Sequence, residues 1–293
     1  MINIGEYNEL EAFQLVDAGM FLIEKEADID AEDLEKVLLP NAYLPASLSR
    51  GDSMEVFIYL DSEDRIIATN LKPSVTLNNF AYLPVKEVNS VGAFLDMGLA
   101  KDLLVPYRQQ AVEMQEGKSY LVFMYLDETT NRLIASSKTN RFLNNDDIEI
   151  KEGEEVDLIV SNKTDLGYNV IVNKQHKGLI FQSAIFQQLH TGDAIKGFVK
   201  TIREDKKLDI ILQQQGVSST EPNAQAILDY LKANQGSTTI TDKSAPEDIY
   251  AAFGLSKKAF KRALGALYKK RLVTLTKELT QLADPIQPQH NKN

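Results

Sequence analysis

The sequence predicts a mainly β protein with a C-terminal α+β domain: three small five-stranded barrels in tandem, followed by a winged helix-turn-helix. The first observation behind this prediction is a strand-turn-strand phrase that recurs along the chain. The second is a set of glycines at similar intervals, Gly19, Gly92 and Gly167. The third is the last quarter of the chain, where alternating apolar residues give way to helical periodicity and positive charge.

The repeated phrase predicts a β-hairpin. It reads GDSMEVFIYLDSEDRIIATN from position 51, and a near copy, GKSYLVFMYLDETTNRLIASSK, starts at position 117. Apolar residues alternate on either side of a polar turn, which is typical of two paired strands. Aromatic residues also occupy the second face, Phe57 and Tyr59 in one copy and Phe123 and Tyr125 in the other. The hairpin is therefore either apolar on both faces or presents rings to a ligand, and it must belong to a larger sheet.

The segments before each hairpin complete the module. VDAGMFLIE, SVGAFLDMG and DLGYNVIVN each predict a strand, and VLLP, LLVP and GLIF predict another strand ahead of a short helix. The third hairpin is GDAIKGFVKTIREDKKLDIILQQ. About five short strands in ~70 residues, with a glycine where a strand must bend, indicate an OB-fold barrel. We place the three barrels at residues 1–72, 73–144 and 145–217.

The region from 218 to 285 predicts the winged helix, and the tail 286–293 is expected to be disordered. NAQAILDYLKAN has helical spacing, a second helix is expected to start at Ser244 in a capping box closed by Glu247, and a third follows Ser256. RLVTLTKELTQL then predicts two short strands around a polar turn. Three helices and a β-wing are a helix-turn-helix variant whose third helix enters a nucleic-acid groove.

Charge is distributed unevenly along a chain whose net charge is −10. Acidic residues concentrate in the first half, and the C-terminal region is the basic end. Because an acidic chain repels phosphate at long range, affinity for nucleic acid must come from local patches and stacking. The chain has no Cys, no export signal and no apolar stretch long enough to span a membrane, so we expect a cytoplasmic protein without a membrane partner.

The modules resemble a known RNA-binding repeat. VGAFLDMG…DLLVP…EGKSYLVFMYLD…NRLIAS and LGYNVIV…KGLIFQS…GDAIKGFVKTI…KKLDIILQ are similar to the repeat of ribosomal protein S1. Three such repeats followed by GLSKKAFKRALGALYKKRLV resemble the bacterial conserved virulence factor B family over nearly the whole chain. That resemblance implies RNA binding and regulation of gene expression at the RNA level.

The resemblance and the local charge together give the candidate RNA-binding residues of the barrels. By alignment with the repeat, the rings that would stack on bases are Phe21, Phe94, Tyr168 and Phe181. The third module has no net charge excess and carries cations around its hairpin, which a phosphate-binding groove requires. These cations are Lys196, Lys200, Arg203, Lys206 and Lys207.

The winged helix carries the strongest local positive charge. Its candidate nucleic-acid-binding residues are Lys257, Lys258, Lys261, Arg262, Lys269, Lys270 and Arg271. A basic stripe on one helix can neutralise several phosphates, although an ordinary solvated helix can carry the same stripe. The exposed face of that helix has no Asn or Gln to pair with adenine, so binding would depend on phosphates and shape.

The inventory of reactive residues does not favour an enzyme. His176, His190 and His290 lie in no metal-ligand motif, and no phosphate-binding or nucleophile motif is present. The acidic run DIDAEDLE lacks the spacing and central Gly of a calcium loop. We therefore expect no catalytic residues, no metal and no cofactor, and a non-enzymatic RNA-binding protein. Two alternatives stay open: a duplex-DNA-binding transcriptional regulator that uses the winged helix, and a scaffold whose acidic N-terminal barrels dock a protein partner.

Overall fold

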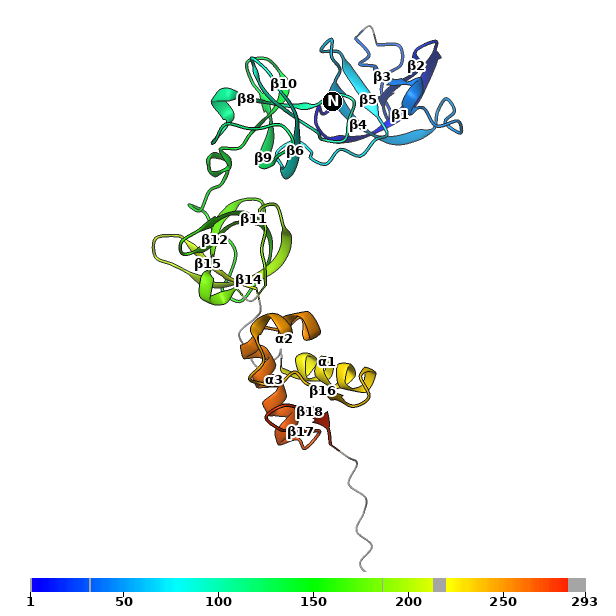
Figure 1. Ribbon diagram of the computed structural model, residues 1–293. Coiled ribbons are helices and arrows are strands. Elements are labelled where there is room, and N and C mark those ends of the chain that lie inside the picture. The colour runs from blue at the N-terminus through cyan, green and yellow to red at the C-terminus, as the bar shows by residue number, and fades with distance from the viewer. Residues whose placement is uncertain (1, 32, 186, 213–219, 284–293) are drawn as a thin grey trace, which may run out of the picture. The chain divides into compact units, whose positions relative to one another are not determined.

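The computed structural model describes residues 2–31, 33–185, 187–212 and 220–283. They form three closed β-barrels and a helical domain with a three-stranded sheet, which confirms the predicted fold class (Figure 1). The first two barrels make up one compact unit, Met1–Asn144, and the third barrel and the helical domain make up the other, Asn145–Asn293. The predicted tail, 286–293, lies outside the described residues.

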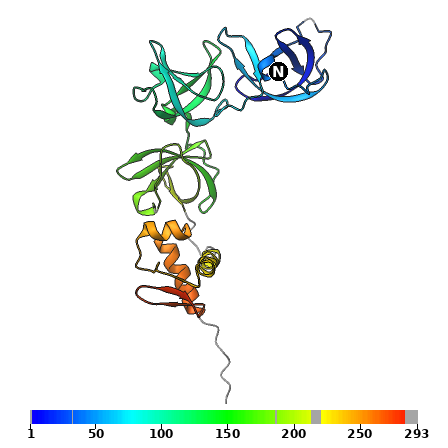
Figure 2. The same ribbon diagram turned by 45° about the vertical axis from the view of Figure 1, so that its right-hand side comes forward.

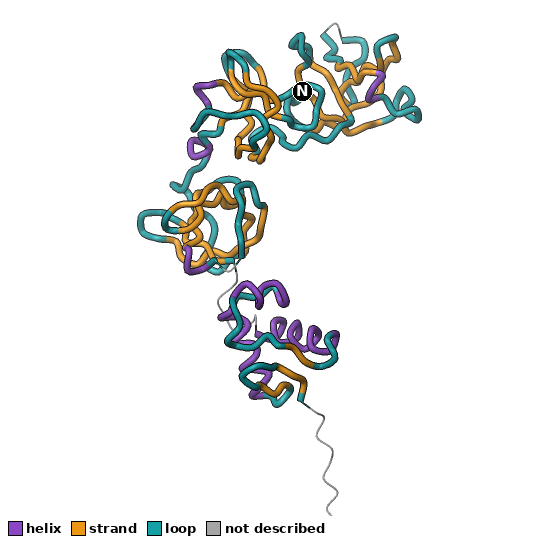
Figure 3. Tube along the Cα trace, in the orientation of Figure 1, coloured by secondary structure: helices purple, strands orange, loops and turns teal. Residues whose placement is uncertain are grey.

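The three barrels share one plan, and strands form most of their regular structure (Figure 3). In each, the first strand pairs with the second and fourth, and the third strand runs parallel to the fifth. The first barrel consists of β1 (Tyr7–Val16), β2 (Gly19–Glu24), β3 (Val37–Pro40), β4 (Ser53–Leu60) and β5 (Ile66–Thr69). The second consists of β6 (Phe80–Val88), β7 (Gly92–Leu95), β8 (Leu103–Pro106), β9 (Ser119–Asp127) and β10 (Arg132–Ser136). The third consists of β11 (Glu155–Thr164), β12 (Gly167–Val172), β13 (His176–Phe181), β14 (Ala194–Ile202) and β15 (Leu208–Ile211).

Short 3-10 helices follow the third strand of each barrel, where the sequence predicts a short helix. They are η1 (Asn41–Tyr43), η2 (Tyr107–Gln109) and η4 (Gln182–Ala184), and a further one, η3 (Thr139–Phe142), follows β10. The barrels thus keep the predicted order of elements.

The recurring glycines allow two backbones to approach closely. Gly19, Gly92 and Gly167 have φ of +151°, +157° and +148°. A Cβ atom at these positions would lie 2.0, 2.3 and 2.0 Å from the carbonyl oxygen of the neighbouring third strand. No side chain fits at such a distance, so the barrel closes at this point only with glycine.

The first two barrels each have a hydrophobic core, and the core of the second extends to two aromatic residues of the first. Phe57 and Tyr59 are 0% and 3% exposed, although they lie on the outer face of the first barrel, because they pack among core residues of the second. In the second barrel, the Phe123 ring lies 4.1 Å from the Phe142 ring of η3. The aromatic face of the repeated hairpin is therefore packed against protein. The hairpin is apolar on both faces and does not present these rings to a ligand.

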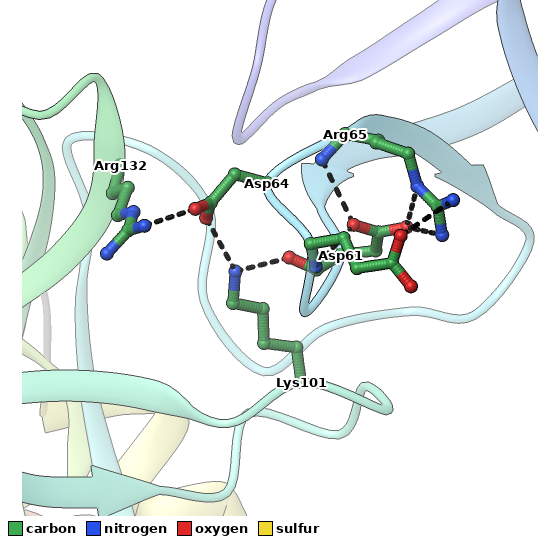
Figure 4. Close-up of polar contacts among 6 residues, drawn as sticks. Asp61, Asp64, Arg65, Lys101 and Arg132 are labelled. Atoms are coloured by element: carbon green, nitrogen blue, oxygen red, sulfur yellow. Dashed lines mark hydrogen bonds and ion pairs between the residues drawn. The ribbon is translucent and has the colours of Figure 1, made fainter.

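A polar contact joins the same two barrels beside this core (Figure 4). Asp64, in the turn between β4 and β5, accepts a hydrogen bond from Arg132 at the start of β10. Lys101 Nζ donates to the carbonyl of Asp61 at 2.6 Å and lies 3.5 Å from Asp64 Oδ1. The hydrogen bond from Arg132 lowers the pKa of Asp64 from its ordinary value. The turn is thereby held against the second barrel by charge as well as by packing.

The winged-helix domain consists of α1 (Thr220–Ala233), β16 (Ser237–Thr238), α2 (Pro246–Phe253), α3 (Lys257–Lys269), β17 (Val273–Leu275) and β18 (Thr280–Leu282). The three strands form one sheet in the order β16-β18-β17. Figure 2 shows α3 beside the β17–β18 hairpin, which is the predicted wing. Phe260, Ala263, Leu264 and Leu267 of α3 are buried in the core of this domain.

The helix starts agree with the sequence prediction in one case and not in the other. Ser256 caps α3, since its hydroxyl accepts a hydrogen bond from the Ala259 amide at 3.2 Å. The predicted capping box at Ser244 is wrong, because α2 begins at Pro246 with Ala245 as its N-cap and no side-chain cap. The Ser244 hydroxyl instead accepts from the amide of Thr241 at 3.0 Å, in the turn before the helix.

Candidate nucleic-acid interface

A ring, a cation and a carboxylate meet on the third barrel. Phe181 ends β13 opposite Gly167, and the guanidinium carbon of Arg203, just after β14, lies 5.9 Å from its ring centroid. Arg203 Nε donates to Oδ1 of Asp209 on β15 at 3.0 Å. The structure therefore brings together two predicted residues, Phe181 and Arg203, and adds Asp209, which was not predicted from the sequence.

The ring and the guanidinium of this group lie at the protein surface, and the carboxylate below them is largely buried. The side chain of Arg203 is 37% exposed and that of Asp209 only 16%, so the carboxylate holds the guanidinium beside the ring from below. A half-buried ring next to a partly exposed cation can stack on an unpaired base, and the cation can contact a neighbouring phosphate. Asp209 was detectable in principle, because it is the charged residue inside the apolar strand LDII.

Tyr168 lies next to this group but faces the core. It follows Gly167 on β12, is partly buried, and packs against the hydrophobic core of the third barrel. The matching positions in the first two barrels are Met20 and Ala93, both buried. Asn169 takes the outward position that Phe21 and Phe94 occupy. A stacking role for Tyr168 stays a prediction, and the site itself rests on Phe181.

The predicted lysines of the third barrel are mostly paired with acids. Lys196 lies 2.7 Å from Asp157, a hydrogen bond that raises the pKa of Lys196. Lys206 lies 3.5 Å from Asp146, and Lys207 lies 2.7 Å from Asp205. Lys200 is exposed and has no ion pair with any residue of the described ranges. Of these four lysines, Lys200 is thus the one whose charge is not offset by a neighbouring acid.

In the first two barrels, the predicted rings occupy equivalent places. Phe21 on β2 lies opposite Leu38 of β3, and Phe94 on β7 lies opposite Leu104 of β8. Both rings are half-buried. Each ring is thus available on the outer surface of its barrel beside an aliphatic neighbour, and its role in RNA binding stays a prediction.

The exposed face of α3 is basic. Lys258, Arg262 and Lys269 are exposed on the side opposite the buried residues of this helix. Gly265 lies among them, and a Cβ atom there would have no neighbour within 4 Å. Nothing inside the protein requires glycine at this position, whereas a helix interior normally disfavours it. The bare surface would let a phosphate backbone approach the helix closely.

The other predicted cations of this domain differ in their surroundings. Lys257 Nζ donates to the carbonyl of Ser244 at 2.8 Å, so its charge is used in the turn before α2. Lys261 lies 3.9 Å from Asp242. Lys270 forms the C-cap of α3, and Arg271 follows it, exposed and with φ of +56°. The predicted set thus divides into an exposed stripe of Lys258, Arg262 and Lys269, two lysines that contact the segment before α2, and two residues at the C-terminal end of α3.

Among the described residues, no cluster of three or more His, Asp or Glu side chains is placed to bind a metal ion. Over the same ranges, no helix is long and apolar enough to cross a membrane.

Barrels of this strand order joined to a winged helix define a class of multidomain nucleic-acid-binding proteins. Comparison with known families agrees: residues 4–71 and 79–138 match the S1 domain, and residues 225–282 match the CvfB-like winged helix domain. The chain belongs to the conserved virulence factor B family. Both matched domains are nucleic-acid-binding domains rather than enzymes.

Relatives cover most of the chain. YitL of Bacillus subtilis is 30% identical over 90% of this chain and 89% of its own length. Conserved virulence factor B of Staphylococcus epidermidis is 24% identical over 77% of this chain and 78% of its own. A crystal structure of a multidomain protein with nucleic acid binding domains from Streptococcus pneumoniae is 24% identical, with a TM-score of 0.41, and covers 95% of this chain and 98% of its own.

Proposed function

We propose that this protein is a non-enzymatic, cytoplasmic RNA-binding protein that regulates gene expression. It binds RNA through the third barrel and the winged helix. The observation that supports the proposal is the group formed by Phe181, Arg203 and Asp209, because a ring that can stack on a base lies 5.9 Å from a cation that can bind a phosphate. The exposed stripe on α3 supplies further phosphate contacts.

A second candidate function has its own support. The stripe on α3, with the uncovered Gly265 inside it, also fits the groove of duplex DNA, as in other winged helices. In that case the protein is a transcriptional regulator, and the barrels serve another purpose. The acidic first unit would then be a docking surface for a protein partner.

Fluorescence anisotropy of the full chain with labelled single-stranded RNA, single-stranded DNA and duplex DNA separates these functions. We expect RNA to bind most tightly, with an affinity that falls steeply from ~50 to ~200 mM salt because phosphate contacts release counterions. Phe181→Ala should weaken RNA binding at least ~5-fold, the loss of about one base stack. The matched control is Tyr82→Ala, which removes an exposed ring from the second barrel.

A charge reversal on α3 completes the experiment. The double variant Lys258→Glu with Arg262→Glu should weaken RNA binding, and Lys118→Glu on the second barrel is its control. Preference for duplex DNA, with sensitivity only to the α3 variant, would establish the DNA-binding function instead. An absence of binding to all three nucleic acids would leave the protein-docking function.

A further inference from the structure

A second ring and cation group lies on the first barrel. Lys36 Nζ is 5.1 Å from the centroid of the Phe13 ring, and the guanidinium carbon of Arg50 is 5.6 Å from it. The ring is half-buried and both cations are exposed. Phe13 was not among the rings that the sequence predicts, because it lies on the first strand of the barrel and not on the glycine-marked strand that follows.

The backbone fixes this group in place. The pairing of β1 with β2 shifts between Ala12 and Gln14, so Phe13 is the extra residue of a β-bulge. Ala12 exchanges hydrogen bonds of 2.8 and 2.9 Å with Gly51 and Asp52, which brings the loop that holds Arg50 against the bulge. Lys36 is the residue immediately before β3. Three segments of the barrel therefore converge on one ring.

The other barrels do not repeat this arrangement. At the corresponding bulge of the second barrel stands Lys86, which lies 2.9 Å from Asp102 and 3.3 Å from Asp96. In the third barrel the bulged residue is Ser161. The first barrel thus carries an aromatic ring and two cations where the second carries a lysine paired with two acids.

Neither cation of the first barrel is neutralised by an ion pair within the described residues. The acids next to them in sequence bind backbone amides: Asp52 Oδ2 accepts from the amide of Ser49 at 2.8 Å, and Glu35 Oε2 accepts from the amide of Ile2 at 3.5 Å. Two exposed cations without acidic partners are notable in the acidic part of the chain. They are free to bind an anion.

We propose that Phe13, Lys36 and Arg50 form a second RNA-binding site, in which an unpaired base stacks on the ring and the two cations bind the adjoining phosphates. This inference rests on the proposed function. Because the acidic barrel repels phosphate at long range, the site binds after RNA is held elsewhere on the chain, when the second contact is intramolecular. Its ligand is single-stranded RNA long enough to reach more than one barrel.

The chain contains no tryptophan, which makes a direct optical test available. Phe13→Trp introduces a single indole at the site, and Tyr82→Trp, on β6 of the second barrel, is the matched control. Both full-length variants are titrated with a labelled oligouridine of about 30 nucleotides, since an OB-fold covers ~4–16 nucleotides. Anisotropy reports binding, and indole emission reports stacking. We expect emission of Phe13→Trp to fall over the same concentrations as the anisotropy rises, and that of Tyr82→Trp to stay constant.

Affinity provides the second readout. Phe13→Leu keeps an apolar side chain in the bulge and removes the ring, so it should weaken binding of the oligouridine by about 5-fold or more. Lys36→Ala with Arg50→Ala should reduce the slope of log affinity against log salt by up to ~1.4, or ~0.7 for each phosphate contact, whereas Lys118→Ala should not. If Phe13→Trp bound RNA with unchanged indole emission and Phe13→Leu bound RNA with wild-type affinity, this site would be overturned. The proposed function would remain intact. No RNA binding by any full-length form would overturn both.

Discussion

The Arg203–Asp209 pair makes a prediction that separates charge from geometry at the third barrel. In the wild type, Arg203 Nε donates to Asp209 Oδ1 at 3.0 Å. Asp209→Asn keeps an oxygen that can accept this hydrogen bond, so the guanidinium should stay beside the Phe181 ring. The substitution also removes the negative charge beneath it. We therefore expect Asp209→Asn to bind RNA more tightly than the wild type, and Arg203→Ala to bind it more weakly.

The magnitude follows from one phosphate contact. On single strands each contact contributes ~0.7 to the slope of log affinity against log salt. Between ~50 and ~200 mM salt, one contact thus changes the affinity ratio by about 2.6-fold. Arg203→Ala should reduce the slope of log affinity against log salt by up to ~0.7, and Asp209→Asn should increase it by up to ~0.7. Arg203→Ala should also reduce the free energy of unfolding by about 1–3 kcal/mol, since a largely buried carboxylate loses its hydrogen-bond partner.

A salt series of anisotropy titrations measures both slopes, and urea unfolding confirms that the variants are folded. If Asp209→Asn weakened RNA binding as much as Arg203→Ala, the pair would serve only to maintain the barrel. The assignment of Arg203 to phosphate binding would then be wrong.

Three further predictions concern stability, each measured by urea unfolding of the full chain. Gly265→Ala should raise the free energy of unfolding of the winged helix by about 1 kcal/mol, because alanine favours a helix and its Cβ meets nothing within 4 Å; a loss of stability would contradict this. Phe57→Ala should lower the free energy of unfolding of the first unit by about 3–5 kcal/mol, since the ring is 0% exposed; a loss below ~1 kcal/mol would show that the two barrels do not depend on this contact. The lowered pKa of Asp64 means that its contact with Arg132 stabilises the fold above the ordinary aspartate pKa of about 4, and that this contribution is lost as pH falls through the pKa of the folded state. The difference between wild type and Asp64→Asn should therefore shrink from pH ~7 to pH ~3, and an unchanged difference would exclude the ion pair as its cause.

Sequence patterns predicted the fold because they are local. Each repeat contains its own alternating apolar residues and its own glycine for close strand contact, such as Gly167. These signals predict each barrel whatever lies next to it. The joining of the first two barrels depends instead on which surface covers Phe57 and Tyr59, and a doubly apolar strand looks the same whether it contacts a ligand or another barrel. Only the tertiary structure distinguishes the two.

The candidate site was predictable in part for a similar reason. Phe181 and Arg203 were both identified from the sequence, but counting lysines around the hairpin could not show that Lys196 and Lys207 are paired with acids. Ion pairing depends on the rotamers of long side chains, which charge patterns do not specify. The site on the first barrel was missed because Phe13 owes its place to a bulge that strand periodicity does not reveal.

The central claim is that RNA is bound at the third barrel and the winged helix. Photo-crosslinking of the full chain to RNA that contains 4-thiouridine, followed by mass spectrometry of the crosslinked peptides, tests it most directly. We expect crosslinks at peptides that contain Phe181 and Arg203 and along α3, and we expect Phe181→Ala to reduce the crosslinks of the third barrel. Crosslinks confined to the acidic turns of the first two barrels, or none at all under conditions that crosslink a known RNA-binding protein, would contradict it.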